Sequence, residues 1–335
     1  MIKKWLIITG RALLYTVSNF LLPLAVTILR RFRLVDFVFL VYPGTDQDFQ
    51  KYYFSKKLNR CFPSLTLAGI VRKGSAGKRG IVMGTHYTID EMANGRFNEV
   101  LKQVTGFSNS IGARTIALAG RMPSLLIKNG IRAEPPLVLG NMGATFVVTE
   151  SVEQIIKDRR MALDRVKVGV MGIGFVGRRV INSLKSLGIC DIRGVDINLK
   201  DSYRNNGLRL GNDASLLEKC DLIIVLTTRG EDIEKAIPHF KKGAILLDDT
   251  HPSIPQKYLA VLERNGNRVF KVVTGLDGIK FFPRLPNFDP EWIPGCVIEA
   301  IVLSGGADCQ NQEEFNRLAR QCGFRALLVA PRGES

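Results

Sequence analysis

Short apolar runs rich in β-branched residues alternate with helical segments in the second half of the chain. Five such runs predict buried strands, at 166–171, 191–196, 220–228, 243–249 and 269–274. Amphipathic segments at 178–188 and 231–240 predict helices between them. Strands separated by helices of this length are typical of a doubly wound parallel sheet. We therefore expect an α/β fold with a Rossmann-type, dinucleotide-binding domain over residues 160–279.

A glycine-rich turn follows the first of these strands and opens the first helix. Gly172, Gly174 and Gly177 form a GxGxxG motif, whose glycines permit the tight turn, the close approach of a pyrophosphate and helix–strand packing. Asp196 lies 24 residues after Gly172, in the window for binding the adenosine ribose hydroxyls. Its carboxylate repels a 2′-phosphate, which favours NAD(H) over NADP(H). The remaining predicted cofactor-binding residues are Phe175, Val176, Thr227 and Thr228. Glycines that serve packing alone are the alternative interpretation.

The chain on both sides of this segment is long enough to form a second α/β domain. Residues 45–150 predict mixed helices and strands, and residues 280–335 predict a helical end. We expect 45–159 and 280–335 to pack together as a substrate and catalytic domain. The helix expected within 145–160 links the two domains. Ligands of open parallel sheets bind outside the carboxyl ends of the strands, so side chains that follow strands are the candidates for chemistry.

An apolar segment within residues 1–44 is flanked by cations at both ends. Residues 12–29 carry no charge, and Pro23 lies near their middle. Eighteen residues are short for a bilayer span, so we predict that residues 1–34 lie in the interface of an anionic membrane, as a hairpin or an in-plane helix. A buried helix of the fold is the alternative.

The charge of the chain is concentrated in the same region. The 335 residues include 47 Lys and Arg and 31 Asp and Glu, a net charge of +16, of which +11 lies in the first 80 residues. No basic helix-turn-helix or aromatic RNA-binding signature accompanies the cations, so we expect no nucleic-acid partner. The basic residues at 51–79 suit lipid headgroups or an acidic carrier protein equally.

Cysteine usage bears on compartment and on metals. The six cysteines are scattered, which predicts reduced thiols in the cytoplasm, and no His/Cys cluster predicts a metal site. Together with the apolar segment, this indicates a cytoplasmic protein that is peripheral or monotopic at the inner face of the membrane.

Three residues are candidates for catalysis. Cys296 follows a Pro-Gly pair at the start of an apolar helical run, where the helix dipole and free N–H groups stabilise a thiolate. It is a candidate nucleophile, and a buried packing cysteine is the alternative. Glu299, one turn later, is a candidate acid or base, or a group that orients the thiol. His251 follows the strand at 243–249 and is a candidate proton donor, with a solvated loop histidine as the alternative.

Several motifs occur in a fixed order between residues 80 and 330. They are I111-G-A-R-T-I-A-L-A-G120, S124-L-L-I-K-N129, L139-G-N-M-G143, the glycine loop, I245-L-L-D-D-T-H-P252, T274-G-L-D-G-I279, G295-C-V-I-E-A-I-V-L303, N311-Q-E-E-F-N-R-L-A-R-Q-C322 and G323-F-R-A-L-L-V329. In this order the chain resembles the long-chain acyl-[acyl-carrier-protein] reductases known from cyanobacteria. The resemblance implies a substrate domain joined to a Rossmann domain. It further implies reduction of a fatty acyl thioester to an aldehyde through an acyl-cysteine intermediate at Cys296.

The resemblance also implies partners and substrate-side residues. The resemblance implies that an acyl-carrier protein or coenzyme A carries the acyl group. It also makes Ser124 and Asn141 candidates for substrate binding. His86 is a third candidate because it lies in the presumed substrate domain. Asp196 departs from the pattern, because those reductases use NADPH and carry a basic residue there. The resemblance therefore favours NADPH where Asp196 favours NAD(H). The apolar basic N-terminus is a second departure and bears on substrate delivery.

Two other functions stay open at this point. A dehydrogenase of the shikimate or glutamyl-tRNA reductase type has the same two-domain plan and acts on a small polar substrate. A Lys–Asp pair in the substrate domain would favour the shikimate type, and no convincing pair is evident. A non-catalytic, membrane-associated dinucleotide-binding protein would bind NAD(H) without depending on Cys296.

Overall fold

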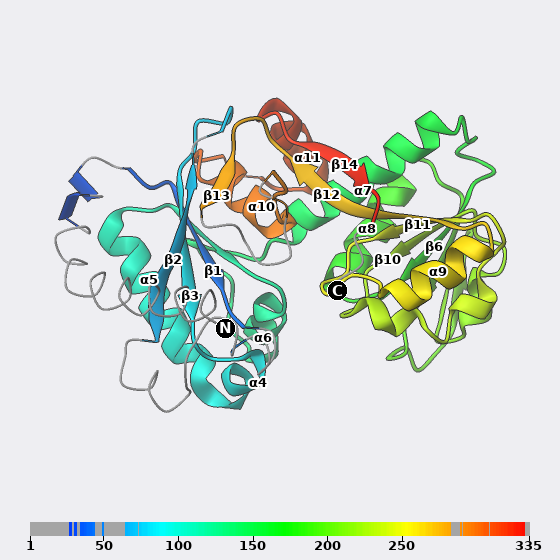
Figure 1. The fold of residues 1–335 in the computed structure, drawn as a ribbon, viewed down its shortest axis with the longest axis horizontal. Coiled ribbons are helices and arrows are strands. Elements are labelled where there is room, and N and C mark those ends of the chain that lie inside the picture. The colour runs from blue at the N-terminus through cyan, green and yellow to red at the C-terminus, as the bar shows by residue number, and fades with distance from the viewer. Residues whose placement is uncertain are drawn as a thin grey trace, which may run out of the picture. The chain divides into compact units, whose positions relative to one another are not determined.

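The computed structural model describes most of the chain as two compact units. The described residues are 27–28, 30–31, 34–43, 49, 64–72, 74–282, 289, 291–307 and 309–331. Unit 1 comprises residues 1–140, 276–291 and 296–309, and unit 2 comprises residues 141–275, 292–295 and 310–335. Each unit contains its own β-sheet with helices packed on it (Figure 1).

The sheet of unit 2 has eight strands in the order β14-β12-β11-β10-β6-β7-β9-β8. The strands are β6 (Lys167–Met171), β7 (Asp191–Val195), β8 (Tyr203–Asn205), β9 (Leu208–Gly211), β10 (Leu222–Val225), β11 (Ile245–Asp248), β12 (Arg268–Gly275) and β14 (Arg325–Val329). The six inner strands are parallel, whereas β8 and β14 are antiparallel to their neighbours at the two edges. Strand order reverses between β6 and β10, as in a doubly wound sheet. The predicted α/β fold of Rossmann type is confirmed.

The helices of unit 2 include those expected within 145–160 and at 178–188, whereas the helix at residues 256–264 was not predicted. They are α7 (Asn141–Asp158), α8 (Phe175–Ser186), α9 (Gln256–Arg264) and α11 (Gln312–Gln321), with a 3₁₀ turn η2 (Ala214–Leu217). The helix predicted at 231–240 is wrong, because two 3₁₀ turns occupy that stretch, η3 (Gly230–Ile233) and η4 (Ile237–His239). Pro238 explains the break, since its ring and missing N–H do not fit the interior of one continuous helix.

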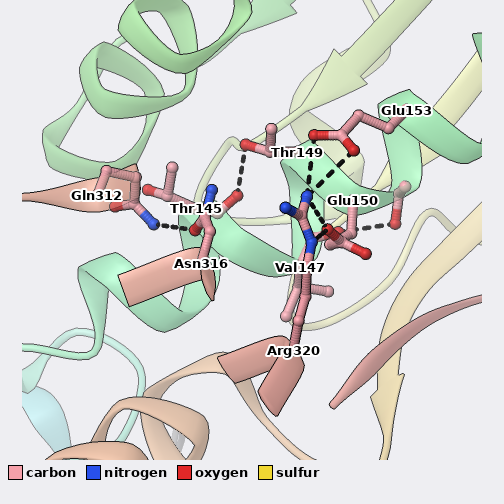
Figure 2. Close-up of polar contacts among 9 residues, drawn as sticks. Thr145, Val147, Thr149, Glu150, Glu153, Gln312, Asn316 and Arg320 are labelled. Carbon is pink, nitrogen blue, oxygen red and sulfur yellow. Dashed lines mark hydrogen bonds and ion pairs between the residues drawn. The ribbon is translucent and has the colours of Figure 1, made fainter. Parts of the chain in front are cut away.

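A polar seam joins α11 to α7 in unit 2 (Figure 2). The Arg320 guanidinium donates to the carboxylates of Glu150 and Glu153, which lie on α7, and the Nη2–Oε2 distance to Glu153 is 3.1 Å. Further along the seam, Gln312 donates to the Met142 carbonyl at 2.9 Å. Because β14 follows α11 directly, these contacts position the last strand of the sheet.

The sheet of unit 1 has six strands in the order β13-β2-β3-β1-β4-β5. The strands are β1 (Phe37–Val41), β2 (Leu65–Arg72), β3 (Gly80–Thr85), β4 (Thr115–Leu118), β5 (Leu137–Val138) and β13 (Lys280–Phe282). Strands β3, β1, β4 and β5 are parallel, and β2 and β13 are antiparallel additions at one edge. The helices are α4 (Ile89–Glu91), the π-helical turn η1 (Met92–Arg96), α5 (Phe97–Ile111), α6 (Met122–Lys128) and α10 (Gly295–Leu303).

Apolar side chains of α5 form the core on one face of this sheet. Phe97, Val100 and Val104 of the helix are almost fully buried and belong to one cluster with Val38 and Ile81 of the strands. Burying side chains of this size contributes about 1.5–3 kcal/mol each. The core therefore fixes the parallel strands whose carboxyl ends carry the candidate site of unit 1.

Three domain boundaries differ from those drawn on the sequence. Residues 1–44 were expected to form a separate segment, but β1 lies in the middle of the unit 1 sheet, between β3 and β4. Residues 280–335 were assigned to the substrate domain, but β14 belongs to unit 2 because it pairs with β12. The helix expected to link the domains, α7, is part of unit 2.

The proposed membrane segment falls mostly outside the described residues. Of the apolar stretch 12–29, residues 27 and 28 alone are described, and both are helical. None of the helices in the described part of the chain has the length and apolar character that a bilayer span requires. The expectation that residues 1–34 contact a membrane therefore stays a prediction.

Candidate functional site

The glycine loop of unit 2 follows β6 at the carboxyl edge of the sheet. Gly172 has φ +90°, a conformation that favours glycine, and a Cβ there would lie 2.7 Å from the Leu226 carbonyl oxygen. A Cβ on Gly177 would lie 2.0 Å from the Gly172 carbonyl oxygen. Both positions therefore require glycine, because the strand, the turn and α8 approach each other at backbone distance.

The N-terminus of α8 opens toward space that none of the described residues of unit 2 fills. Gly174 is the N-cap, no side chain caps the helix, and a Cβ at Gly174 would meet nothing within 4 Å. Phe175 and Val176 form the first turn, with Phe175 40% exposed. Free N–H groups and the helix dipole favour an anion at such a terminus. The three glycines together fit a pyrophosphate, which needs the close backbone approach that Gly174 leaves open.

Asp196 follows β7 and contacts the glycine loop. One carboxylate oxygen accepts a hydrogen bond from the Ile173 N–H at 2.7 Å, and the other accepts from the backbone and side chain of Asn198. Ile197 is 87% exposed at the same strand end. The nearby cation Arg193 is 5% exposed and pairs with Asp191 at 3.0 Å, so it is not placed to contact a 2′-phosphate. Arg193 therefore does not neutralise the negative charge of Asp196.

Strands β10 and β11 bring their following loops to the same edge. Val225 at the end of β10 lies opposite Met171 of β6 on one side and Asp248 of β11 on the other. Thr227 is partly exposed and donates to the Arg229 carbonyl at 2.9 Å, and Thr228 is exposed. The predicted cofactor-binding residues therefore come together at one edge of the unit 2 sheet.

A buried ion pair joins the end of β11 to the middle of β12. Asp248 and Lys271 are register partners, with 3.6 Å between Nζ and Oδ2, and they are 0% and 3% exposed. Asp248 also accepts from the Thr250 N–H and hydroxyl and from the Ile254 N–H, while Lys271 donates to the Thr250 carbonyl. The pair therefore holds the 249–254 turn in shape. His251 lies in this turn, after the strand as predicted, and is exposed.

Asp249 is a second carboxyl group in the same turn and lies only partly exposed. Burial raises the pKa of Asp249 to about 7; the charge of Lys271 lowers it and that of Asp248 raises it. A carboxyl group with a pKa near neutrality is suited to proton transfer at physiological pH.

The raised pKa of Asp249 predicts a pH dependence of stability. The folded state keeps a proton that the unfolded state has lost, so wild-type stability should fall by up to about 1.4 kcal/mol per pH unit as the pH rises toward 7. Asp249→Asn cannot bind this proton. The free energy of unfolding of the variant, relative to that of the wild type, should therefore increase as the pH rises to about 7 and then stay constant. Urea unfolding at a series of pH values measures the difference, with Asp201→Asn, at an exposed position, as the control. A difference that does not change with pH would contradict the prediction.

In unit 1, Cys296 lies in the first turn of α10 and packs against backbone. Gly140 has φ +73°, and a Cβ there would lie 2.4 Å from the Cys296 Cβ. Two hydrogen bonds attach α10 to the sheet: the Thr115 hydroxyl donates to the Ala300 carbonyl at 2.9 Å, and Arg114 donates to the Ser304 carbonyl at 3.2 Å. Cys296 is partly exposed, so its thiol is held at a helix N-terminus without being sealed in the core.

Tyr42 follows β1, and its phenol interacts electrostatically with Cys296. Its hydroxyl oxygen accepts a hydrogen bond from the Arg121 N–H at 2.9 Å. Burial raises the pKa of the Tyr42 phenol, Arg121 lowers it, and the charge of Cys296 adds to the increase. The raised pKa keeps the Tyr42 hydroxyl protonated, so it can act as a hydrogen-bond donor.

The other predicted catalytic and substrate residues are distributed unevenly. Glu299 is 3% exposed on α10, one turn after Cys296. His86 is buried directly after β3, which pairs with β1, so His86 and Tyr42 follow neighbouring parallel strands. Ser124 is exposed on α6, and Asn141 is buried at the start of α7 in unit 2. Unit 1 thus combines Cys296, Glu299 and His86, while His251 and Asn141 belong to unit 2.

Comparison with known proteins gives similarity at the level of structure. No family model matches the sequence, and no curated protein does. A dipicolinate synthase chain from Bacillus halodurans is 13% identical with a TM-score of 0.32, and 46% of this chain aligns with 57% of it. For the NAD-dependent malic enzyme from Thermotoga maritima the identity is 17% and the TM-score 0.40, with 70% of this chain aligned with 65% of that one.

A third similar structure is L-tryptophan dehydrogenase from Nostoc punctiforme, 14% identical with a TM-score of 0.42, covering 86% of this chain and 80% of that one. The chain thus spans less than two thirds of the length of the first two proteins. The assignment of the fold rests on the strand order and connectivity of the two sheets.

Two residues at these edges were not found from the sequence. Tyr42 ends an apolar run that we placed in an N-terminal segment, so the position of its hydroxyl after a core strand was not visible. Asp249 lies within the motif quoted for the strand at 243–249, next to Asp248, and two adjacent acids after a strand were the available signal. The neighbouring His251 drew the assignment instead, because its unperturbed pKa is nearest neutrality.

Proposed function

We propose that the protein is an NAD(P)H-dependent reductase that converts a fatty acyl thioester to an aldehyde through an acyl-cysteine at Cys296. The observation that carries the proposal is the placement of Cys296 at the N-terminus of α10, against Gly140 and within electrostatic reach of Tyr42. A partly exposed thiol at a helix N-terminus is the position expected for a nucleophilic cysteine. The motif order shared with the acyl-[acyl-carrier-protein] reductases supports the same reaction.

Unit 2 contains the residues that would hold the cofactor. The pyrophosphate would lie on the N–H groups at the start of α8, beside Gly174, and the ribose hydroxyls would contact Asp196. When bound, a nicotinamide dinucleotide supplies a hydride to the acyl carbon. A carboxylate at Asp196 disfavours a 2′-phosphate, so we propose NAD(H) as the preferred form, although the resemblance favours NADPH.

The chain's own groups account for the other steps. The Cys296 thiolate forms a bond to the thioester carbon, the bond to the carrier sulfur breaks, and the carrier thiolate leaves and takes up a proton. Backbone N–H groups at the start of α10 and the Tyr42 hydroxyl would stabilise the carbonyl oxygen while it carries negative charge. After the acyl carbon has been reduced, the carbon–sulfur bond to Cys296 breaks and releases the aldehyde and the thiolate. The balance is one hydride and one proton consumed for each thioester.

Two glycine variants separate cofactor binding from folding. Gly177→Ala places a Cβ 2.0 Å from a carbonyl oxygen, so the backbone must move, and we expect about 1–3 kcal/mol of destabilisation together with loss of dinucleotide affinity. Gly174→Ala meets no protein atom, so its stability should change by less than about 1 kcal/mol while its dinucleotide affinity falls at least about tenfold. Titration with NADH and with NADPH, followed by fluorescence, measures the affinity. Wild-type affinity in Gly174→Ala would contradict a pyrophosphate at this loop.

The decisive test is intact-protein mass spectrometry after mixing the full chain with a long-chain acyl-coenzyme A or acyl-carrier protein, without reduced nicotinamide. We expect an added acyl mass that disappears as aldehyde when NADH or NADPH is supplied. Cys309→Ala and Cys322→Ala, which remove other partly exposed thiols, should retain the adduct, whereas Cys296→Ala should lose it. The proposal would be refuted if protein that binds the dinucleotide formed no adduct with either carrier. That result would favour a non-catalytic dinucleotide-binding protein.

A further inference from the structure

Strands β2 and β13 of unit 1 carry exposed apolar side chains on one face. Phe282 on β13 and Ile70 on β2 are register partners and are 69% and 46% exposed. Leu67 on β2 is 41% exposed. A β-bulge between residues 67 and 69 places Leu67 opposite Met83 and Ile70 opposite Ile81, both on the face of β3 that belongs to the core cluster. The face that is buried in the middle of the sheet therefore continues, exposed, over its antiparallel edge.

A row of cations lies beside these apolar side chains. Lys280 on β13 and Arg72 on β2 are register partners, both exposed, two residues along each strand from Phe282 and Ile70. Because side chains two residues apart on a strand share a face, the cations and the apolar side chains lie on the same face. Arg79, also exposed, precedes β3 at the same end of the strands. Neither β2 nor β13 contains an acidic residue.

We propose that this face, defined by Leu67, Ile70, Phe282, Arg72 and Lys280, docks on an anionic membrane surface. The apolar side chains would enter the boundary between headgroups and acyl chains, and the two cations would contact lipid phosphates. Protection of an edge strand against pairing explains a lysine on β13 but does not explain an aromatic side chain that is 69% exposed. The proposal does not depend on the reductase function.

The chemistry of the face favours lipid over an acidic carrier protein. Adjacent rows of exposed apolar and cationic side chains on one strand face match the layered chemistry of a membrane, in which phosphates lie directly above acyl chains. Recognition of an acidic protein would rest on the cations and would leave Phe282 and Ile70 without a role. The residues of this face lie on β2 and β13 and not within residues 1–34, so the two lipid contacts can be tested separately.

A tryptophan placed at residue 282 tests the contact directly. The full chain carrying Phe282→Trp is mixed with vesicles of phosphatidylcholine and phosphatidylglycerol in equal parts, with brominated acyl chains as quencher, or with pure phosphatidylcholine vesicles. The wild type supplies the background of the two native tryptophans, and Ile127→Trp, at a residue 47% exposed on α6, is the matched control. We expect a blue shift and quenching of the residue 282 signal with the anionic vesicles alone, and no change at residue 127.

Charge reversal tests the role of the cations. Arg72→Glu with Lys280→Glu should weaken binding to the anionic vesicles at least about tenfold, and high salt should have the same effect on wild type. Lys128→Glu with Arg132→Glu, two exposed cations at and beyond the end of α6, is the matched control and should bind as wild type does. A residue 282 signal that stays unquenched while the protein sediments with anionic vesicles would overturn the proposal. A blue shift with an acidic carrier protein and none with vesicles would also overturn it.

Discussion

Replacing Cys296 by alanine is expected to reduce aldehyde formation from a long-chain acyl thioester by at least about a thousandfold. The reason is that none of the other described cysteines lies at the N-terminus of α10. Cys220, for example, is fully buried, and burial raises the pKa of its thiol to about 12. Removal of a covalent nucleophile takes away the bond on which the later steps depend. The steady-state rate of NADH or NADPH oxidation with acyl-coenzyme A or acyl-carrier protein measures the loss.

The same variant carries its own control, because the dinucleotide-binding residues belong to unit 2. Cys296→Ala should fold and bind NADH with wild-type affinity. If the variant binds the cofactor normally and forms aldehyde at the wild-type rate, Cys296 is a packing residue and not the nucleophile. Tyr42→Phe keeps the ring and removes the hydroxyl, so we expect a smaller loss in the rate than for Cys296→Ala if Tyr42 stabilises the carbonyl oxygen.

Replacing Lys271 by methionine is expected to destabilise the protein by about 3–5 kcal/mol. Methionine fills a similar volume but leaves the carboxylate of Asp248, which is 0% exposed, without its ion-pair partner. The hydrogen bond to the Thr250 carbonyl is lost as well, so the turn that follows β11 loses one of its two anchors. Urea unfolding at neutral pH measures the change.

The matched control is Arg268→Met, on the same strand but exposed, which should cost less than about 0.5 kcal/mol. The double variant Lys271→Met with Asp248→Asn should be more stable than Lys271→Met alone, because it leaves no unpaired charge in the core. Equal stability of the single and double variants would show that the buried pair has no electrostatic role. We also expect weaker NADH binding in Lys271→Met, since the turn lies at the proposed cofactor edge.

Unit 2 could be predicted in detail because its signals are local. The β-branched runs and the glycine motif lie close together in sequence, and the glycine turn leads directly from β6 into α8. Strand β14 was not predicted, because its segment is only partly buried and becomes a strand through pairing with β12, some fifty residues earlier. The sequence of residues 325–329 does not show that β12 is their pairing partner.

The site of unit 1 could be predicted only in part, because it joins distant segments. Cys296 was found from the Pro-Gly pair and the apolar run that follows it. Gly140 and Tyr42, which lie against it or close to it, come from the ends of other strands and were recognisable only once those strands were placed in one sheet. The strand before Tyr42 is buried on both faces, so it shows no alternation that would distinguish it from an apolar helix.

The pairing of β14 with β12 affects the order in which the protein can fold during synthesis. Strand β12 is synthesised before β14, and the residues between them belong mainly to unit 1. Until β14 leaves the ribosome, β12 presents an open edge, and the sheet of unit 2 cannot be completed. A nascent chain stalled before residue 325 would therefore expose an unpaired strand, and a chaperone that covers such edges would act after the rest of this sheet has been synthesised.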